Sequence, residues 1–125
     1  MEAEAVKTIM LRIGRRTWTG VHSEVMDFEI GKMVDLERQL NIALMLDAMA
    51  LKVVADESEK ARAVALQRIG FKPVDAAHIA CAERARADVF LTTDDALLKN
   101  ATKHSGGLRV NVANPLSWLR EVLEA

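Results

Sequence analysis

Short apolar segments that suit strands alternate with longer segments that suit helices along this chain of 125 residues. LKVV (51–54) and VFLTT (89–93) are predicted to be buried strands, because they are short, apolar and rich in β-branched residues. TWTGVH (17–22) and LRVNV (108–112) are two further strand candidates. Since helices separate each strand from the next, this order predicts an α/β fold, in which a mostly parallel sheet carries helices on both faces.

Capping residues mark where the helices begin and end. Gly14 ends the first helix, and Ser23 is the predicted N-cap of the second. Asp56 and Glu59 have the spacing of a capping box, and Pro73 suits the first turn of a helix. The further helices are expected at about 24–33, 35–49, 56–69, 73–87 and 95–104, with a last one after Asn114 and Pro115. In the helix at 35–49, one stripe consists of Leu36, Leu40, Ala43 and Leu44.

Composition excludes several classes of protein. The chain has 17 Lys and Arg against 18 Asp and Glu, so a nucleic-acid partner would have to be held by a local patch or by a metal. Cys81 is the only cysteine, which excludes an internal disulfide and a cysteine-rich metal site and favours a reducing cytoplasm. The most hydrophobic stretch, 42–55, is interrupted by Asp47 and Lys52, so we expect neither a signal peptide nor a membrane partner.

Three acidic residues are candidates for a ligand site at the edge of the predicted sheet. Asp94 directly follows the strand at 89–93, Asp75 lies in the first turn of its helix, and Glu29 lies in the helix after TWTGVH. In parallel sheets, ligands bind outside the carboxyl ends of the strands. Asp94 alone has two interpretations, a helix N-cap or a metal ligand, and the sequence leaves both open.

Carboxylates that cluster raise one another's pKa, so a fold that assembles them needs a cation to offset the repulsion. Mg²⁺ or Mn²⁺ suits carboxylate oxygens and keeps several waters. Such an ion can activate a water and neutralise charge on a phosphodiester. Glu29, Asp75 and Asp94 together therefore indicate a divalent-metal site for phosphate chemistry.

Three blocks of the chain, SEVMDFEI (23–30), FKPVDAAHIACAERARADVFLTTDDALLK (71–99) and LRVNVANPLSWL (108–119), resemble the PIN-domain nuclease family, which includes the VapC-type toxin ribonucleases. The resemblance implies a three-layer α/β/α fold and cleavage of RNA with Mg²⁺ or Mn²⁺. It also implies that Glu29, Asp75 and Asp94 are both the catalytic and the metal residues, accompanied in the motif by Ser23 and Thr92. An antitoxin protein is the partner that the toxin subfamily implies.

One departure from the family pattern concerns the N-terminus. PIN domains begin with a strand that ends in Asp and lies at the centre of the sheet, whereas residues 1–9, MEAEAVKTI, resemble the helix that follows it. We therefore expect residues 1–125 to form a single PIN-like domain without this central strand, with weakened metal binding and impaired catalysis. Either Met1 is a mis-assigned or internal start, or the chain is a short form that has lost catalysis. The alternative function is a non-catalytic module that binds RNA or protein, or forms a homodimer through its exposed sheet edges.

Several other residues have a structural and a functional interpretation. His78 lies three residues after Asp75 on the same helical face, so it could reach the acids or a phosphate, or it could be a buried residue with one hydrogen bond. Asp95 suits a first-turn helix acid or an assistant to the metal. Thr92 could orient Asp94 or a water. Cys81 is predicted to be a packed thiol.

Basic and aromatic residues outside these motifs favour structural roles. The densest basic cluster, Arg12, Arg15 and Arg16 at the end of the first helix, could contact an RNA backbone, but the sequence favours a solvated helix end. Trp18 and Trp118 are predicted to be core or interface residues rather than a pair that stacks on bases.

Overall fold

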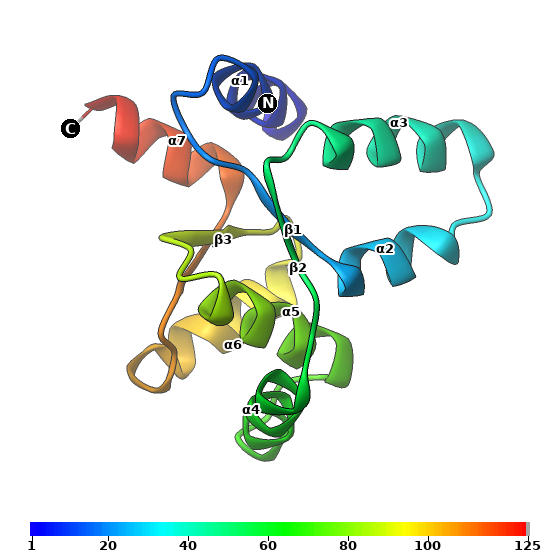
Figure 1. The fold of residues 1–125 in the computed structure, drawn as a ribbon. Coiled ribbons are helices and arrows are strands. Elements are labelled where there is room, and N and C mark those ends of the chain that lie inside the picture. Colours follow the sequence, from blue (N-terminus) through cyan, green and yellow to red (C-terminus); the bar gives the residue numbers. More distant parts are fainter. Residues whose placement is uncertain (125) are drawn as a thin grey trace.

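The computed structural model describes residues 1–124, which form helices and short strands in the predicted order (Figure 1). The elements are α1 Glu2–Gly14, β1 Val21–Ser23, α2 Glu24–Gly31, α3 Leu36–Asp47, β2 Leu51–Val53, α4 Glu57–Arg68, α5 Pro73–Arg84, β3 Val89–Leu91, α6 Asp95–Lys103, the 3₁₀ turn η1 Ser105–Gly107, β4 Asn111–Ala113 and α7 Pro115–Glu124. The predicted sequence of helices and strands is therefore confirmed, and each strand is shorter than the segment expected for it.

The strands pair in parallel, as expected, but they form two separate sheets. β1 pairs with β2, with Val21 opposite Leu51, and β3 pairs with β4, with Val89 opposite Asn111. Within residues 1–124 no ladder of hydrogen bonds joins the two pairs. The chain is therefore an α/β protein, and the single sheet between two helical layers stays a prediction.

β2 is much less buried than its apolar sequence predicted. Leu51 is 51% exposed and Val54, just beyond the strand, is 64% exposed. The prediction of a buried strand at LKVV is wrong. Among residues 1–124, β2 pairs with β1 alone and has few other elements packed on its faces. Apolar composition indicates a strand but not whether other elements cover it.

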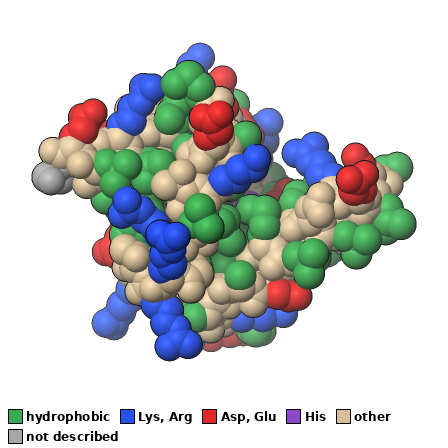
Figure 2. Space-filling model, turned by 90° about the horizontal axis from the view of Figure 1, so that it is seen from above, with side chains coloured by type: hydrophobic (Ala, Val, Ile, Leu, Met, Phe, Trp, Pro, Cys, Tyr) green, Lys and Arg blue, Asp and Glu red, His purple; other side chains and the backbone are tan. Residues whose placement is uncertain are grey.

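The leucine stripe of α3 also faces solvent. Leu36, Leu40 and Leu44 are 65%, 56% and 68% exposed, while Leu46 is buried. α3 packs on α2, and the side chain of Gln39 donates a hydrogen bond to the carbonyl of Ile30 at 2.9 Å. Figure 2 shows hydrophobic side chains along the arm at the right, where Figure 1 places α2 and α3.

The main core surrounds α5. This helix contacts α2, α4, β1 and β3, and Ala76 and Ile79 on it are fully buried. Its alanine-rich sequence lets neighbouring elements approach closely. The cluster comprises Ala63, Leu66, Phe71, Ala76, Ile79, Ala80, Leu97, Ala101 and Val110. α5 contacts both β1 and β3, so the helix that carries Asp75 and His78 lies against both sheets.

A second apolar cluster joins α1 to α7. Ala5 and Ile9 on α1 pack with Leu119 on α7. Trp18 and Trp118 lie beside them in an edge-to-face contact, with ring centroids 4.9 Å apart and an interplanar angle of 62°. The predicted packing role of the two tryptophans is therefore confirmed.

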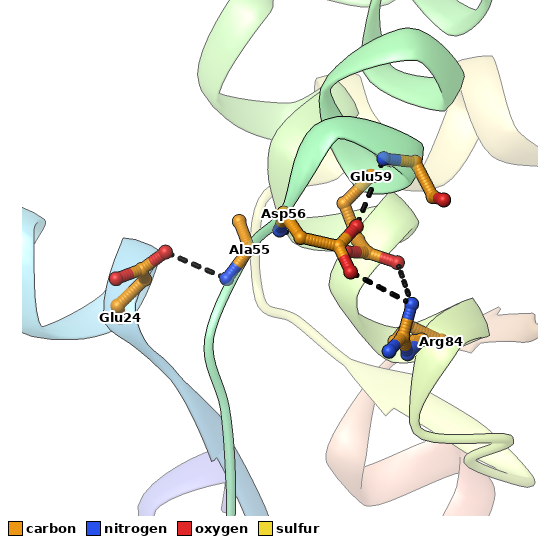
Figure 3. Close-up of polar contacts among 6 residues, drawn as sticks. Glu24, Ala55, Asp56, Glu59 and Arg84 are labelled. Carbon is orange, nitrogen blue, oxygen red and sulfur yellow. Dashed lines mark hydrogen bonds and ion pairs between the residues drawn. The ribbon is translucent and has the colours of Figure 1, made fainter.

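Polar contacts fasten the start of α4 to its neighbours (Figure 3). The capping box is present, because the N–H of Asp56 donates to Glu59 at 2.8 Å and the side chain of Asp56 accepts from the backbone of α4. Arg84 on α5 donates to both carboxylates, at 3.2 and 3.0 Å. The N–H of Ala55 donates to Glu24 on α2 at 2.6 Å. The predicted capping box thus also links α4 to α5, and the adjacent Ala55 links the start of α4 to α2.

Candidate active site

Asp94 is the N-cap of α6, which is one of the two roles that the sequence left open for it. Its Oδ1 accepts a hydrogen bond from the N–H of Leu97 at 3.1 Å, and its own N–H donates to the hydroxyl of Thr92 at 3.2 Å. Thr92 therefore fixes the backbone from which the Asp94 side chain projects. The capping role uses one carboxylate oxygen, so it does not exclude a second role for the other.

Asp75 lies in the first turn of α5, which Pro73 begins. Burial, and next the negative charge of Asp94, raise the pKa of Asp75. His78 and Lys72 oppose this rise, and the charge of Glu29 adds to it. The charges of Asp94 and Glu29 therefore both act on the Asp75 carboxyl group.

Glu29 comes from α2 and meets α5 at His78. One carboxylate oxygen, Oε1, contacts Nε2 of the His78 imidazole. The His78 side chain is only 9% exposed, whereas that of Glu29 is 50% exposed. The ring of Phe90 on β3 stacks on the imidazole, with centroids 5.6 Å apart and an interplanar angle of 24°. His78 therefore connects β3, α5 and α2 at the site.

The donor chemistry of the three acids fits a divalent cation, but the side chains do not converge as they stand. Over residues 1–124, no group of three or more His, Cys, Asp or Glu is arranged to hold a metal ion. Glu29 and Asp94 each use one oxygen in hydrogen bonds within that part of the chain, and Asp75 makes none. Each of the three thus keeps an oxygen that could serve as a ligand. The shared pocket of Glu29, Asp75 and Asp94 stays a prediction.

Ser23 has a structural role at the start of α2. It is 3% exposed and accepts a hydrogen bond from the N–H of Met26 at 3.4 Å, as the predicted N-cap. Burial raises the pKa of the Cys81 thiol, while a hydrogen bond with Ser23 lowers it. Cys81 is buried, which confirms the packed thiol. Ser23 thus helps to set the direction of the helix that carries Glu29.

The remaining candidates lie at the surface. Asp95 is an exposed first-turn acid of α6, in agreement with its structural interpretation. Arg15 and Arg16 are exposed just beyond the end of α1, and Arg16 has a positive φ of 62°. Arg12 lies over the ring of Trp18, with its Cζ 5.3 Å from the centroid. Arg12 thus has a packing partner of its own, which agrees with a structural role for this helix end.

Phe90 is the site residue that sequence reasoning missed. It lies inside the predicted strand, where alternation places it on the face opposite Val89 and Leu91. Only the packing of α5 against β3 reveals that this face meets His78. No local signal in the sequence predicts that contact.

The model of the PIN domain family matches residues 19–103. This range covers Glu29, Asp75 and Asp94 and most of the chain, so the protein belongs to the PIN domain family. No match was found among curated proteins or among solved structures. Within the part that the structure describes, none of the helices combines the length and the apolar character needed to cross a membrane.

Proposed function

We propose that residues 1–125 act as one PIN-like domain of a metal-dependent ribonuclease. Membership of the family supports a nuclease-type activity and nucleic-acid binding. The observation that carries the proposal is the contact of Glu29 on α2 with His78 on α5, which brings Glu29 to the helix that carries Asp75. The raised pKa of Asp75, caused first by burial and then by the charge of Asp94, with Glu29 contributing, supports it. Carboxylates in such surroundings are the ones that a cation would stabilise most.

Glu29, Asp75 and Asp94 are the residues that would hold Mg²⁺ or Mn²⁺. When bound, such an ion supplies an activated water and neutralises charge on the scissile phosphate. The protein's part is to orient the acids. Thr92 fixes the backbone of Asp94 through the hydrogen bond at 3.2 Å, and Ser23 sets the start of α2.

Asp95 is proposed to add negative charge beside the site without binding the ion directly. It follows Asp94 in the first turn of α6, where the helix dipole favours an acid. We further propose that the substrate is RNA and that the protein belongs to the VapC-like toxins, with an antitoxin protein as partner. The motif blocks at 23–30 and 71–99 support this assignment.

The test compares two aspartates with the same structural role. Asp35 caps α3 by accepting from the N–H of Arg38 at 3.1 Å, just as Asp94 caps α6. Asn caps as well as Asp, so Asp35→Asn and Asp94→Asn should both fold. Asp94→Asn should abolish Mn²⁺-dependent cleavage of labelled RNA, and Asp35→Asn should cleave at the parent rate. Equal cleavage by the parent and Asp94→Asn would refute the assignment of Asp94.

A second candidate function is a non-catalytic interaction module. The observation that favours it is that, across residues 1–124, each strand pairs on one side only. Unpaired strand edges can bind an extended segment of another chain or of a second copy. Calorimetry with Mn²⁺ separates the two candidates, since no binding at millimolar metal would favour the module. Light scattering on the same sample reports whether a homodimer forms.

A further inference from the structure

His78 is the most buried ionisable side chain at the site, and it contacts an acid on another helix. Only 9% of its side chain is exposed, and its ring stacks on Phe90 of β3. Its Nε2 faces Oε1 of Glu29. A residue this constrained can fix the position of a partner that is itself free to move.

Glu29 needs such a partner. It lies near the end of α2, a helix of eight residues with no buried residue among those described. Half of its side chain is exposed, and a long, exposed carboxylate samples many rotamers in the absence of a hydrogen bond. In residues 1–124, His78 is the one side chain that hydrogen-bonds the Glu29 carboxylate.

The second nitrogen of His78 indicates which tautomer makes the contact. Nδ1 is buried and has no hydrogen-bond partner in the part of the chain that the structure describes. A proton on Nδ1 would be a buried donor without an acceptor, and a carboxylate oxygen offers no proton to Nε2. The hydrogen bond therefore requires the proton on Nε2, which donates to Oε1 and leaves Oε2 of Glu29 free.

We propose that His78 is a positioning residue that holds the Glu29 carboxylate against α5, the helix that carries Asp75, and leaves Oε2 available as a metal ligand. This inference rests on the proposed function and adds to it the residue that orients one ligand. Hydrogen bonds from buried groups to carboxylate ligands commonly set ligand orientation in metal sites. Asp75 lies one turn before His78 on α5, so one helix carries both an acid of the site and the residue that positions another.

Two substitutions of His78 separate positioning from packing. The amide nitrogen of Gln at this position lies near the place of Nε2, whereas that of Asn lies near the place of Nδ1. His78→Gln should therefore keep the hydrogen bond to Glu29, and His78→Asn should lose it. His104→Gln is a matched control, because His104 packs against Phe71 and not against the acids.

The first readout is Mn²⁺ affinity, measured from the EPR signal of free Mn²⁺ without RNA. His78→Asn and Glu29→Gln should each weaken binding roughly 10-fold or more, and the double variant should be no weaker than Glu29→Gln alone. His78→Gln and His104→Gln should bind as the parent does. If Glu29→Gln weakens binding and His78→Asn does not, positioning by His78 is wrong while the ribonuclease proposal stands.

Two other outcomes would each overturn the positioning role of His78. If neither Glu29→Gln nor His78→Asn changes Mn²⁺ affinity, the ligand role of Glu29 fails and the positioning role fails with it. If His78→Asn weakens binding and Glu29→Gln does not, His78 acts by another route and the positioning proposal is overturned.

A second readout needs no substitution of His78. In ¹⁵N NMR of the labelled imidazole, the parent should show the proton on Nε2, and Glu29→Gln should shift that nitrogen signal. An unchanged Nε2 signal in Glu29→Gln, or a proton on Nδ1 in the parent, would overturn the hydrogen bond on which positioning depends.

Discussion

Arg62 on α4 and Glu83 on α5 form a two-point ion pair. Nε of Arg62 lies 2.7 Å from Oε1 of Glu83, and one terminal nitrogen lies 3.1 Å from Oε2. The Glu83 carboxylate also accepts from the N–H of Arg109 at 2.8 Å, and Arg62 donates to the carbonyl of Gly107 at 2.6 Å. The pair thus fastens the loop before β4 to the two helices of the main core. Its side chains are mostly buried, at 25% and 4% exposure.

We predict that Glu83→Gln destabilises the protein in a pH-dependent way. Burial raises the pKa of Glu83, but hydrogen bonds from Arg62 and the Arg109 backbone outweigh it and lower the pKa below its usual value of 4.5. The charged carboxylate therefore stabilises the fold above that value, and this contribution is lost as the pH falls through the lowered pKa.

Urea unfolding of the parent and the Gln variant checks this. The free energy of unfolding of Glu83→Gln should be about 2 kcal/mol below that of the parent at about pH 7. This difference should become smaller at about pH 3.5. Glu121→Gln is the control, because Glu121 is exposed on α7 and has no ion pair within residues 1–124. A loss for Glu83→Gln that stays constant with pH would contradict the ionic contribution.

Gly20 is predicted to tolerate no side chain. A Cβ at this position would lie 2.8 Å from Cγ of Met49 and 3.1 Å from Cγ2 of Ile13, so one of them would have to move. Gly20→Ala should lower the free energy of unfolding by about 1–3 kcal/mol. At Gly14, where a Cβ meets nothing within 4 Å, Ala should raise it by about 0.5 kcal/mol. Denaturant titration measures the stability of both variants. If Gly20→Ala and Gly14→Ala changed the free energy of unfolding by the same amount, the crowding at Gly20 would be refuted.

Asp94 is predicted to stabilise α6 independently of any metal. Asp94→Ala removes the acceptor for the N–H of Leu97 and should cost about 1 kcal/mol, whereas Asp94→Asn should cost little. Asp35→Ala should cost a similar amount, because Asp35 caps α3 with the same geometry. Unfolding in EDTA measures the three variants free of metal. A loss of stability in Asp94→Asn as large as in Asp94→Ala would contradict the capping role.

Local signals in the sequence predicted most of the elements and their caps. Ser23, Asp56 with Glu59, and Pro73 mark helix starts because capping depends on a few neighbouring backbone groups. The exposed stripe of Leu36 and Leu40 was not predictable in the same way, since periodicity shows which residues share a face but not what covers it.

The acids of the candidate site also differ in whether their positions could be predicted from the sequence. The position of Asp94 follows from a general rule, because the end of a parallel strand and the start of the next helix lie at the edge of the sheet where ligands bind. Asp75 lies at the start of α5, which follows α4 and not a strand, so this rule does not predict its position. The contact of Glu29 with His78 depends on how α2 packs against α5, which spacing alone does not determine. Sequence reasoning therefore named His78 as a candidate but could not identify its partner.

Paramagnetic NMR with Mn²⁺ tests most directly whether Glu29, Asp75 and Asp94 share one cation, because bound Mn²⁺ broadens the signals of amides near it. At a small fraction of Mn²⁺ per protein, the amide signals around these three residues should broaden together, and Asp75→Asn should abolish the broadening at all three. Broadening that spares one of the three segments, or that appears instead around exposed acids such as Asp47 and Glu121, would contradict a common metal site.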